Sequence, residues 1–323
     1  MTPDPVPYDP ELEEGLAAFL AVVEQVPLRA DTIVQNRAIF AATVPSMETL
    51  VAGRPVEWED RLVPGPAGAP DVRITIVRPK GGTAPGTAGI YQIHGGGMIL
   101  GTRFFGIEDL VHSAVAHGTV GVAVEYRLAP EHPAPAQAED CYAGLTWMVE
   151  HAAQMGFDPR RLLLSGFSAG GGIAAAVALM ARDRRGPQIA AVYLGAPMLD
   201  DRNDTVSCRQ YDGIGAWDRN NNHTGWSAAL GPRRGTGDVH PYQAPARATD
   251  LSRLPHTYIE VGAAEVFRDE AVDFASRIWA TGGQCELHVW AGAYHGFANS
   301  PNARVSAAAA AAKRNWLSRV LGL

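Results

Sequence analysis

The chain has 323 residues, 46% of them hydrophobic and 19% charged, which is enough for one large domain with a sizeable core and a smaller appended region. A net charge of −7, with no basic stripe, argues against a nucleic-acid-binding protein, and we expect no nucleic-acid partner. Cys141, Cys208 and Cys285 lie far apart, which argues against a disulfide framework or a zinc site and favours a reducing compartment.

The beginning of the chain does not have the pattern of a secretory signal. Residues 1–5 contain an acid and two prolines, where a signal would have a basic start followed by an apolar run. No stretch approaches eighteen uninterrupted apolar residues, and the alanine-rich segment near the C-terminus is interrupted by Lys313 and Arg314. We therefore expect a cytoplasmic protein with no membrane partner.

The first fifty residues have helical patterns. Asp9, Pro10 and Glu11 place a capping residue, a first-turn proline and an acid in the order typical of a helix start. A second helix is predicted from Asp31 to about Val44, and we expect both helices to pack on the main domain. The apolar residues that recur at helical spacing in the first helix are Leu12, Leu16, Phe19, Leu20 and Val23.

From about residue 55 onward, strand patterns alternate with helix patterns. The near-continuous apolar run at 120–124 is typical of a strand covered on both faces, which indicates a parallel sheet flanked by helices. The first two strands could pair antiparallel as a hairpin at the sheet edge, joined by the Pro/Gly-rich turn at 64–70. The predicted strands cover residues 56–63, 72–78, 88–94, 120–126, 161–166, 189–194, 257–261 and 286–290. The predicted helices cover residues 107–117, 134–153, 169–184, 269–281 and 305–320.

Residues 200–250 interrupt this alternation. The segment is polar and rich in Asn, Gly and Arg, with Tyr211, Trp217 and Trp226 interspersed. A structureless loop of that length is uncommon inside a compact domain, so we predict a small helical insertion or lid.

The pentapeptide Gly-Phe-Ser-Ala-Gly at 166–170 matches the G-x-S-x-G pattern of a nucleophile elbow. Its glycines permit a tight strand-to-helix turn that exposes the hydroxyl of Ser168 at the sheet edge. The pattern alone is weak, but an apolar strand precedes it and a glycine- and alanine-rich helix follows it. The context therefore predicts Ser168 as a catalytic nucleophile.

A second motif, His-Gly-Gly-Gly at 94–97, directly follows a predicted strand. Three consecutive glycines indicate that the backbone must approach another group closely. In ester hydrolysis that group is the oxyanion of the tetrahedral intermediate, which backbone N–H groups stabilise. The N–H groups of Gly96, Gly97 and Ala169 are the candidates, and His94 is expected to shape the loop rather than titrate.

A serine nucleophile requires a general base and an acid that orients it. His295 follows the last predicted strand, which brings it to the edge of the sheet where the elbow opens. Glu265 is the first acid in the loop after the preceding strand, and Asp269 is the alternative. The resulting order of nucleophile, acid and base is that of α/β hydrolases.

Together these residues resemble the bacterial hormone-sensitive-lipase-like esterases, over residues 88–297 and in the same order. The glycine motif at 94–97 is similar to that family's oxyanion motif. The segment Tyr-Arg-Leu-Ala-Pro-Glu-His-Pro at 126–133 resembles the characteristic segment after its next strand. Ser168 and His295 match the nucleophile and the base of the family.

The resemblance implies an α/β-hydrolase fold with an eight-stranded, mostly parallel sheet flanked by helices. It also implies a small helical cap built from residues 1–50 and 200–245, with 51–199 and 246–323 as the catalytic domain. Three positions depart from the family pattern: Glu265 replaces the usual Asp, Phe167 occupies a place where Asp or Thr is common, and Met98 replaces an aromatic residue.

The expected reaction is hydrolysis of a small-molecule carboxylic ester through an acyl-enzyme, with no metal and no organic cofactor. By resemblance, short to medium acyl chains are preferred, with aromatic esters as a further option, and the protein is a monomer or a homodimer. The apolar residues at 98–100 and 104–105 either form a compact substrate site or pack in the core. Two alternatives stay open: an acyltransferase, amidase, lactonase or dehydratase with the same triad, and a non-catalytic ligand-binding protein.

Overall fold

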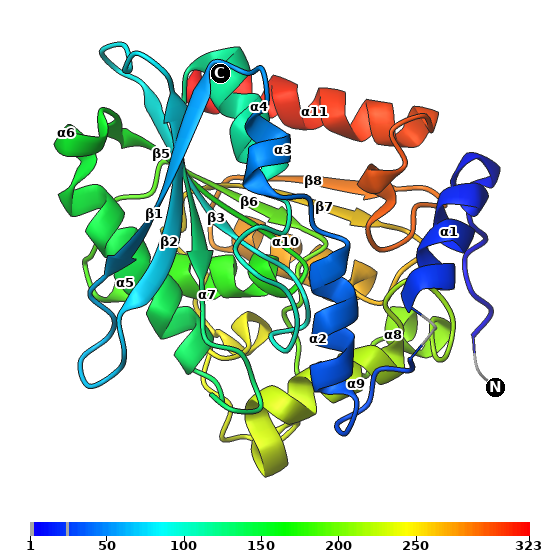
Figure 1. Ribbon diagram of the computed structural model, residues 1–323. Helices are drawn as coiled ribbons and strands as arrows, with labels where there is room; N and C mark the ends of the chain where they lie inside the picture. The colour runs from blue at the N-terminus through cyan, green and yellow to red at the C-terminus, as the bar shows by residue number, and fades with distance from the viewer. Residues whose placement is uncertain (1–2, 24–25) are drawn as a thin grey trace.

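The computed structural model describes residues 3–23 and 26–323, without the side chains of residues 22 and 23. The predicted apolar position Val23 therefore lies outside the described side chains. Figure 1 shows a central sheet with helices on both sides and further helices beyond the carboxyl ends of its strands. None of the helices in the described ranges is both long and apolar enough to cross a membrane.

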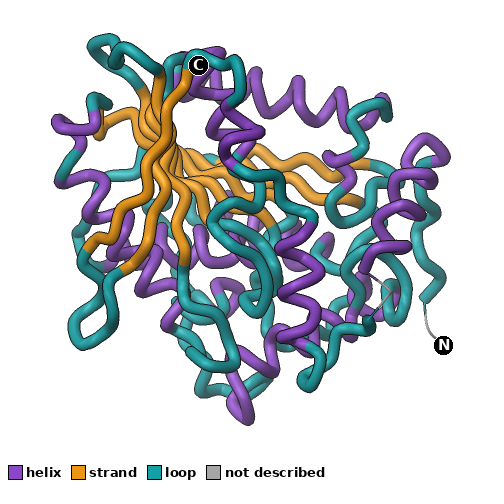
Figure 2. The backbone as a smooth tube through the Cα atoms, viewed as in Figure 1, coloured by secondary structure: helices purple, strands orange, loops and turns teal. Residues whose placement is uncertain are grey.

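Eight strands form one sheet in the order β1-β2-β4-β3-β5-β6-β7-β8, and only β2 runs antiparallel to its neighbours. Figure 2 shows the sheet as a twisted fan. The strands are β1 Val56–Val63, β2 Val72–Pro79, β3 Ala88–Ile93, β4 Val120–Glu125, β5 Asp158–Phe167, β6 Ala191–Gly195, β7 His256–Gly262 and β8 Cys285–Trp290. This arrangement confirms the predicted mostly parallel sheet and its antiparallel hairpin at one edge.

Helices cover both faces of the sheet, which explains why the inner strands are apolar on both sides. One face packs against α3 Met47–Val51, α4 Glu108–His117 and α11 Arg304–Leu321. The other face packs against α5 Ala136–Glu150, α7 Ala169–Asp183 and α10 Arg268–Ala280. The buried side chains on the two faces form two separate apolar clusters.

One helix prediction needs correction, and one helix was not predicted. The predicted helix at 134–153 is two helices, because His151 leaves helical geometry (φ −103°, ψ 13°) between α5 and α6 Ala152–Met155. The His151 ring stacks on Trp147, and its Nδ1 lies 2.8 Å from the Trp147 carbonyl oxygen. The short helix α3 has no counterpart among the predictions; Ser46 caps its N-terminus by accepting a hydrogen bond from the Thr49 N–H.

The N-terminal segment and the insertion are both helical. Asp9 accepts a hydrogen bond from the Glu11 N–H at 2.9 Å, as the predicted cap requires, although the first turn is a 3-10 helix. The N-terminal elements are η1 Pro10–Leu12, α1 Glu13–Val23 and α2 Ile33–Ala42. The insertion contains α8 Val206–Gln210, α9 Arg219–Leu230, η2 Gly231–Arg233 and η3 Pro245–Arg247, and η4 Phe297–Asn299 follows β8.

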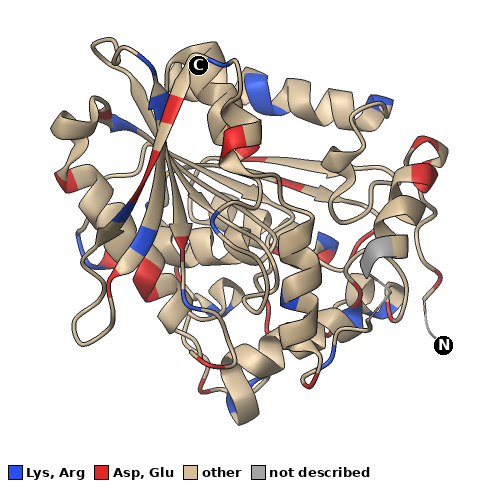
Figure 3. Ribbon diagram, viewed as in Figure 1, with Lys and Arg blue, Asp and Glu red and all other residues tan. Residues whose placement is uncertain are grey.

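Charged residues of both signs are interspersed along the described ribbon, as Figure 3 shows. This distribution fits the mildly acidic composition.

Candidate active site

Ser168 lies at the junction of β5 and α7, in a backbone conformation that side chains rarely adopt (φ 59°, ψ −124°). The turn is tight because the flanking glycines allow backbone to pack on backbone. A Cβ at Gly166 would overlap the carbonyl oxygen of Gly170, and a Cβ at Gly170 would overlap that of Ile93 on β3. Further along α7, Gly172 packs in the same way against the carbonyl oxygen of Met198. The strained backbone conformation of Ser168 is typical of functional sites.

The structure brings Ser168, His295 and Glu265 into one hydrogen-bonded chain. Ser168 Oγ lies 3.0 Å from His295 Nε2, and His295 Nδ1 lies 3.2 Å from Glu265 Oε2. The three residues follow β5, β7 and β8, whose carboxyl ends meet at one edge of the parallel sheet. When Nδ1–H donates to Glu265, Nε2 is left to accept the serine proton.

The alternative acid, Asp269, is occupied elsewhere. Its carboxylate accepts a hydrogen bond from the Ser207 N–H at 2.8 Å and another from Arg268 Nε at 2.8 Å. Asp269 therefore fixes the start of α8 to α10, while the buried Glu265 faces the imidazole.

Two aromatic rings hold the imidazole of His295. Phe167 stacks on it at 5.0 Å between ring centroids, and Phe267 meets it at 5.1 Å with an interplanar angle of 70°. Phe167, noted above as a departure from the family pattern, thus packs on the base. Sequence reasoning missed Phe267, which carries no motif of its own.

The loop that follows β3, residues 94–100, lies beside the serine and is called the glycine loop below. Gly96, Gly97 and Met98 all have positive φ values, of 111°, 62° and 65°. A Cβ at Gly95 would lie 3.2 Å from Ser168 Cβ, so the loop directly contacts the serine. Within the described ranges, the N–H groups of Gly96 and Gly97 donate to no protein acceptor.

His94 is a structural residue of this loop. Its ring is buried, stacks on Tyr126 with centroids 4.0 Å apart, and places Nδ1 2.8 Å from the Gly95 carbonyl oxygen. Burial lowers the pKa of His94, which favours the neutral form of the ring. The Tyr126 hydroxyl donates to the His94 carbonyl oxygen at 2.9 Å. These contacts agree with the expectation that His94 shapes the loop.

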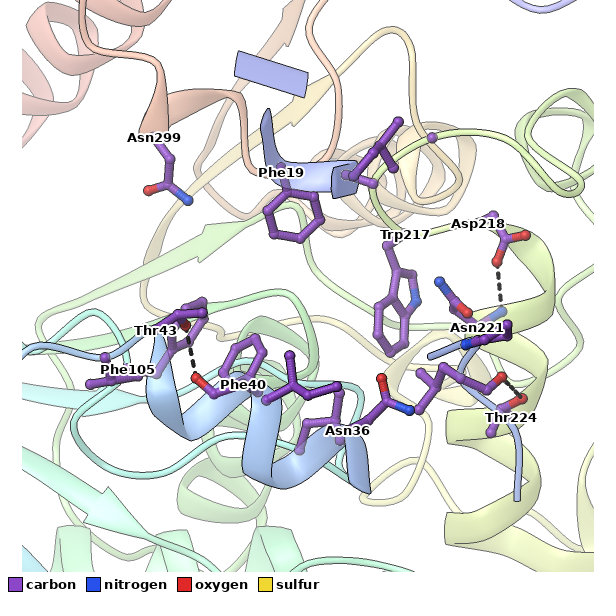
Figure 4. Close-up of a pocket in the computed structure, with 18 of the residues that line it drawn as sticks. Phe19, Asn36, Phe40, Thr43, Phe105, Trp217, Asp218, Asn221, Thr224 and Asn299 are labelled. Carbon is purple, nitrogen blue, oxygen red and sulfur yellow. Dashed lines mark hydrogen bonds between the residues drawn. The ribbon is translucent and has the colours of Figure 1, made fainter. Parts of the chain in front are cut away.

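A cavity of about 1080 Å³ lies next to the glycine loop, between α1, α2 and the insertion. Figure 4 shows Phe19 and Trp217 pointing into it toward Phe40, which lies on α2. Phe40 and Phe105 form a ring pair with centroids 4.6 Å apart.

The glycine loop lies between the cavity and the serine. Ser168 and His295 are not among the described residues that line the cavity. Phe105 and Trp217 do line it, and both also approach the glycine loop. A Cβ at Gly95 would lie 3.5 Å from the Phe105 ring, and one at Gly97 would lie 2.5 Å from the Trp217 ring.

The apolar residues that follow the glycine motif pack in the core, line the cavity, or do both. Met98, Ile99 and Leu100 are buried in the core. Leu100, Phe104 and Phe105 line the cavity.

Glu270, on α10, is a further buried acid. Its Oε1 accepts hydrogen bonds from the N–H groups of Leu199 at 2.7 Å and Asp200 at 3.3 Å. Burial raises the pKa of Glu270 well above its usual range, with smaller contributions from the charges of Asp200 and Glu265.

Among the described residues, no three His, Cys, Asp or Glu side chains are grouped so that they could hold a metal ion.

Comparison with known proteins places the chain in a family. Residues 90–299 match the model of a protein family whose description is 'alpha/beta hydrolase fold'. The chain belongs to the α/β hydrolases. This match confirms the resemblance of the hydrolase to hormone-sensitive-lipase-like proteins, which its sequence motifs indicated.

Two curated relatives are similar to this hydrolase over more than two thirds of their own length. Esterase LipI of Mycobacterium tuberculosis is 34% identical over 251 residues, 74% of each chain. Carboxylic ester hydrolase LipN of the same organism is 33% identical over 83% of this hydrolase and 71% of LipN. Among solved structures, a bacterial heroin esterase is 35% identical with a TM-score of 0.88, covering 97% of this hydrolase and 98% of that chain. Esterase LipW from Mycobacterium marinum is 31% identical with a TM-score of 0.79, over 99% of both chains.

Proposed function

We propose that the protein is a serine carboxylesterase with Ser168 as nucleophile, His295 as general base and Glu265 as the acid that orients the base. The observation that carries the proposal is the hydrogen-bonded chain of these three residues, with the serine on a strained elbow. The names of the relatives support the proposal, because each relative is named as an esterase or a carboxylic ester hydrolase.

In the proposed first step, His295 Nε2 takes the proton of Ser168 Oγ while that oxygen attacks the ester carbonyl carbon. The carbonyl oxygen becomes an oxyanion, which the N–H groups of Gly96, Gly97 and Ala169 stabilise. Each such donor lowers the barrier by about 3 kcal/mol. The Ala169 N–H is suited to this role because the first N–H groups of a helix have no partner within it.

The tetrahedral intermediate then collapses. Its C–O bond to the alcohol breaks, and His295 gives its proton to the departing alcohol oxygen, leaving an ester between Ser168 and the acyl group. Water attacks this acyl-enzyme after losing a proton to His295. The carboxylic acid is released, and Ser168 recovers its proton.

We propose that the substrates are small-molecule esters with short to medium acyl groups, aromatic ones included. The aromatic cavity beside the glycine loop supports this substrate class, since ligand sites of this kind are concave and largely apolar. In this view residues 1–50 and 200–245 form a cap over the catalytic parts 51–199 and 246–323. A cytoplasmic location and a monomeric or homodimeric state complete the proposal.

The test is hydrolysis of p-nitrophenyl esters with acyl chains of two to sixteen carbons. We expect turnover by the wild type and a loss of at least about 10³-fold in kcat for Ser168→Ala, because the nucleophile is gone. Ser276→Ala, which changes a serine bonded only within α10, serves as the control and should keep full activity. A folded wild-type protein that is inert on every ester, or a Ser168→Ala variant that stays active, would contradict the proposal.

A further inference from the structure

Arg37 connects helix α2 to two segments that are distant in sequence. Its Nε donates to the Ile99 carbonyl oxygen at 2.7 Å, and its Nη2 donates to the Ala129 carbonyl oxygen at 2.7 Å. The guanidinium also pairs in bidentate fashion with Glu131, with distances of 2.8 and 2.7 Å. The Arg37 side chain thus connects α2 to both the glycine loop and the 126–133 segment.

Three carbonyl groups of the glycine loop, those of Gly96, Met98 and Ile99, accept hydrogen bonds. The Gly96 carbonyl oxygen accepts hydrogen bonds from the N–H groups of Ile99 at 3.0 Å and Leu100 at 2.8 Å, which closes a tight turn. The Met98 carbonyl oxygen accepts from the Ala129 N–H at 2.9 Å. The Ile99 carbonyl oxygen is the next along the loop, and Arg37 holds it.

Rigid peptide units connect the Ile99 carbonyl to the Gly97 N–H group. The Ile99 carbonyl shares one peptide unit with the Leu100 N–H, which donates to the Gly96 carbonyl oxygen at 2.8 Å. The Gly96 carbonyl in turn shares a peptide unit with the Gly97 N–H, so holding the Ile99 carbonyl restricts the direction of that N–H. Both glycines have positive φ and add no side chain to resist rotation, so their orientation depends on outside contacts. The Arg37 contact supplies one of them from outside the sheet.

The chemistry of Arg37 suits a fixed geometry better than a lysine would. A guanidinium is planar and offers five donors in a rigid fork, so it can hold two carbonyls and a carboxylate at once. The ion pair is partly exposed, with 25% of the Arg37 side chain and 50% of the Glu131 side chain accessible to solvent. Such an exposed pair contributes little to overall stability by itself. Its effect here is to orient the guanidinium, whose part-buried bonds to the Ile99 and Ala129 carbonyls connect α2 to the two segments.

We propose that Arg37 is a positioning residue of the oxyanion hole, through which helix α2 sets the direction of the Gly97 N–H group. Glu131 in turn holds the guanidinium in the orientation that reaches both carbonyls. The inference rests on the proposed esterase function, because it assigns this N–H group to the oxyanion.

The test combines steady-state kinetics with the affinity for a trifluoromethyl ketone, whose adduct with the serine carries an oxyanion. For Arg37→Ala we expect kcat on p-nitrophenyl butyrate to fall about 10- to 100-fold with KM changed less than about threefold, since only the transition state loses contact. The ketone affinity should fall in parallel with kcat/KM. Arg37→Lys and Glu131→Gln should show the same pattern with smaller losses.

The matched control is Arg184→Ala, which removes another bidentate pair, with Glu139 at 2.9 and 2.6 Å, between α5 and the end of α7. It should leave kcat and ketone affinity within about twofold of wild type. The inference is wrong if folded Arg37→Lys and Glu131→Gln both keep wild-type kcat, or if losses occur in KM alone. It is also wrong if kcat falls while ketone affinity stays unchanged. Failure of the proposed function itself would be seen separately, as a wild type that is inert or a Ser168→Ala variant that is active.

Discussion

At the scale of single residues, Glu265 is placed for one interaction. Its Oε2 lies 3.2 Å from His295 Nδ1, and its Oε1 is buried with no hydrogen-bond partner among the described residues. Burying a carboxylate oxygen without a partner is unfavourable. The hydrogen bond to the imidazole is therefore the main interaction that stabilises the Glu265 carboxylate. Asp269, four residues further on, has its own partners in Ser207 and Arg268.

This difference separates the two acids by experiment. Glu265→Gln should lower kcat by about 10²- to 10⁴-fold, because an amide can present N–H to Nδ1 and favour the wrong tautomer of His295. Asp269→Asn should change kcat by less than about threefold. Steady-state kinetics on a p-nitrophenyl ester, with folding checked by circular dichroism, measures both. A larger loss for Asp269→Asn than for Glu265→Gln would assign the acid the other way.

The sequence was sufficient to choose Ser168, His295 and Glu265, because each follows a predicted strand and their order fits one fold. It was not sufficient to find Arg37 or Phe267. Arg37 contacts Ile99 across 62 positions, and a lone arginine in a predicted helix has no local pattern that indicates such a contact. Phe267 differs from any core phenylalanine only by lying against the imidazole.

At the scale of elements, the segment before α9 brings Trp217 against the glycine loop. A Cβ at Gly97 would lie 2.5 Å from the Trp217 ring, and the same ring lines the cavity together with Phe40 and Phe105. The indole therefore limits the space beside the proposed oxyanion hole.

Trp217→Ala should shift the acyl-length profile. Removing the indole enlarges the cavity next to the glycine loop, so kcat/KM for a decanoyl ester relative to a butyryl ester should rise several-fold. The p-nitrophenyl ester series measures this ratio, and Trp279→Ala, a half-exposed tryptophan on α10, is the control. An unchanged ratio for Trp217→Ala would mean that the acyl chain binds elsewhere.

The inner strands were predictable to within a few residues because they are short apolar runs bounded by turns. The break between α5 and α6 was not, since the stacking of His151 on Trp147 overrides a continuous helical pattern. The cavity was also beyond prediction. Its walls come from α1, α2, the loop after β3 and the insertion, and their approach is set by tertiary packing.

At the scale of the whole molecule, the buried Glu270 makes stability depend on pH. Its pKa in the folded protein is raised well above the usual 4.5, so the folded state holds a proton that the unfolded chain has released. Its contribution to stability is therefore fully present below pH 4.5 and is lost as pH rises through the raised folded pKa.

Glu270→Gln removes this titration while keeping an oxygen that can accept the Leu199 N–H. The free energy of unfolding of the wild type should fall relative to that of the variant as pH rises from about 5 to 8. Urea unfolding at several pH values measures the difference. Asp250→Asn is the control, because a hydrogen bond from the Ser252 N–H lowers the pKa of Asp250, so that carboxylate stays ionised over this range. Parallel pH profiles for wild type and Glu270→Gln would contradict the assignment.

The close packing of the elbow also constrains how this protein could be made more thermostable. Replacing glycine with alanine is a common way to stabilise a helix, but at Gly170 and Gly172 the added methyl group would collide with main-chain oxygens of β3 and of the segment after β6. The first turn of α7 is therefore closed to that strategy. Gly237 differs: it lies in the insertion, has no positive φ, and a Cβ there would meet nothing within 4 Å. Directed evolution for heat tolerance should therefore accumulate changes in the insertion and leave the start of α7 untouched.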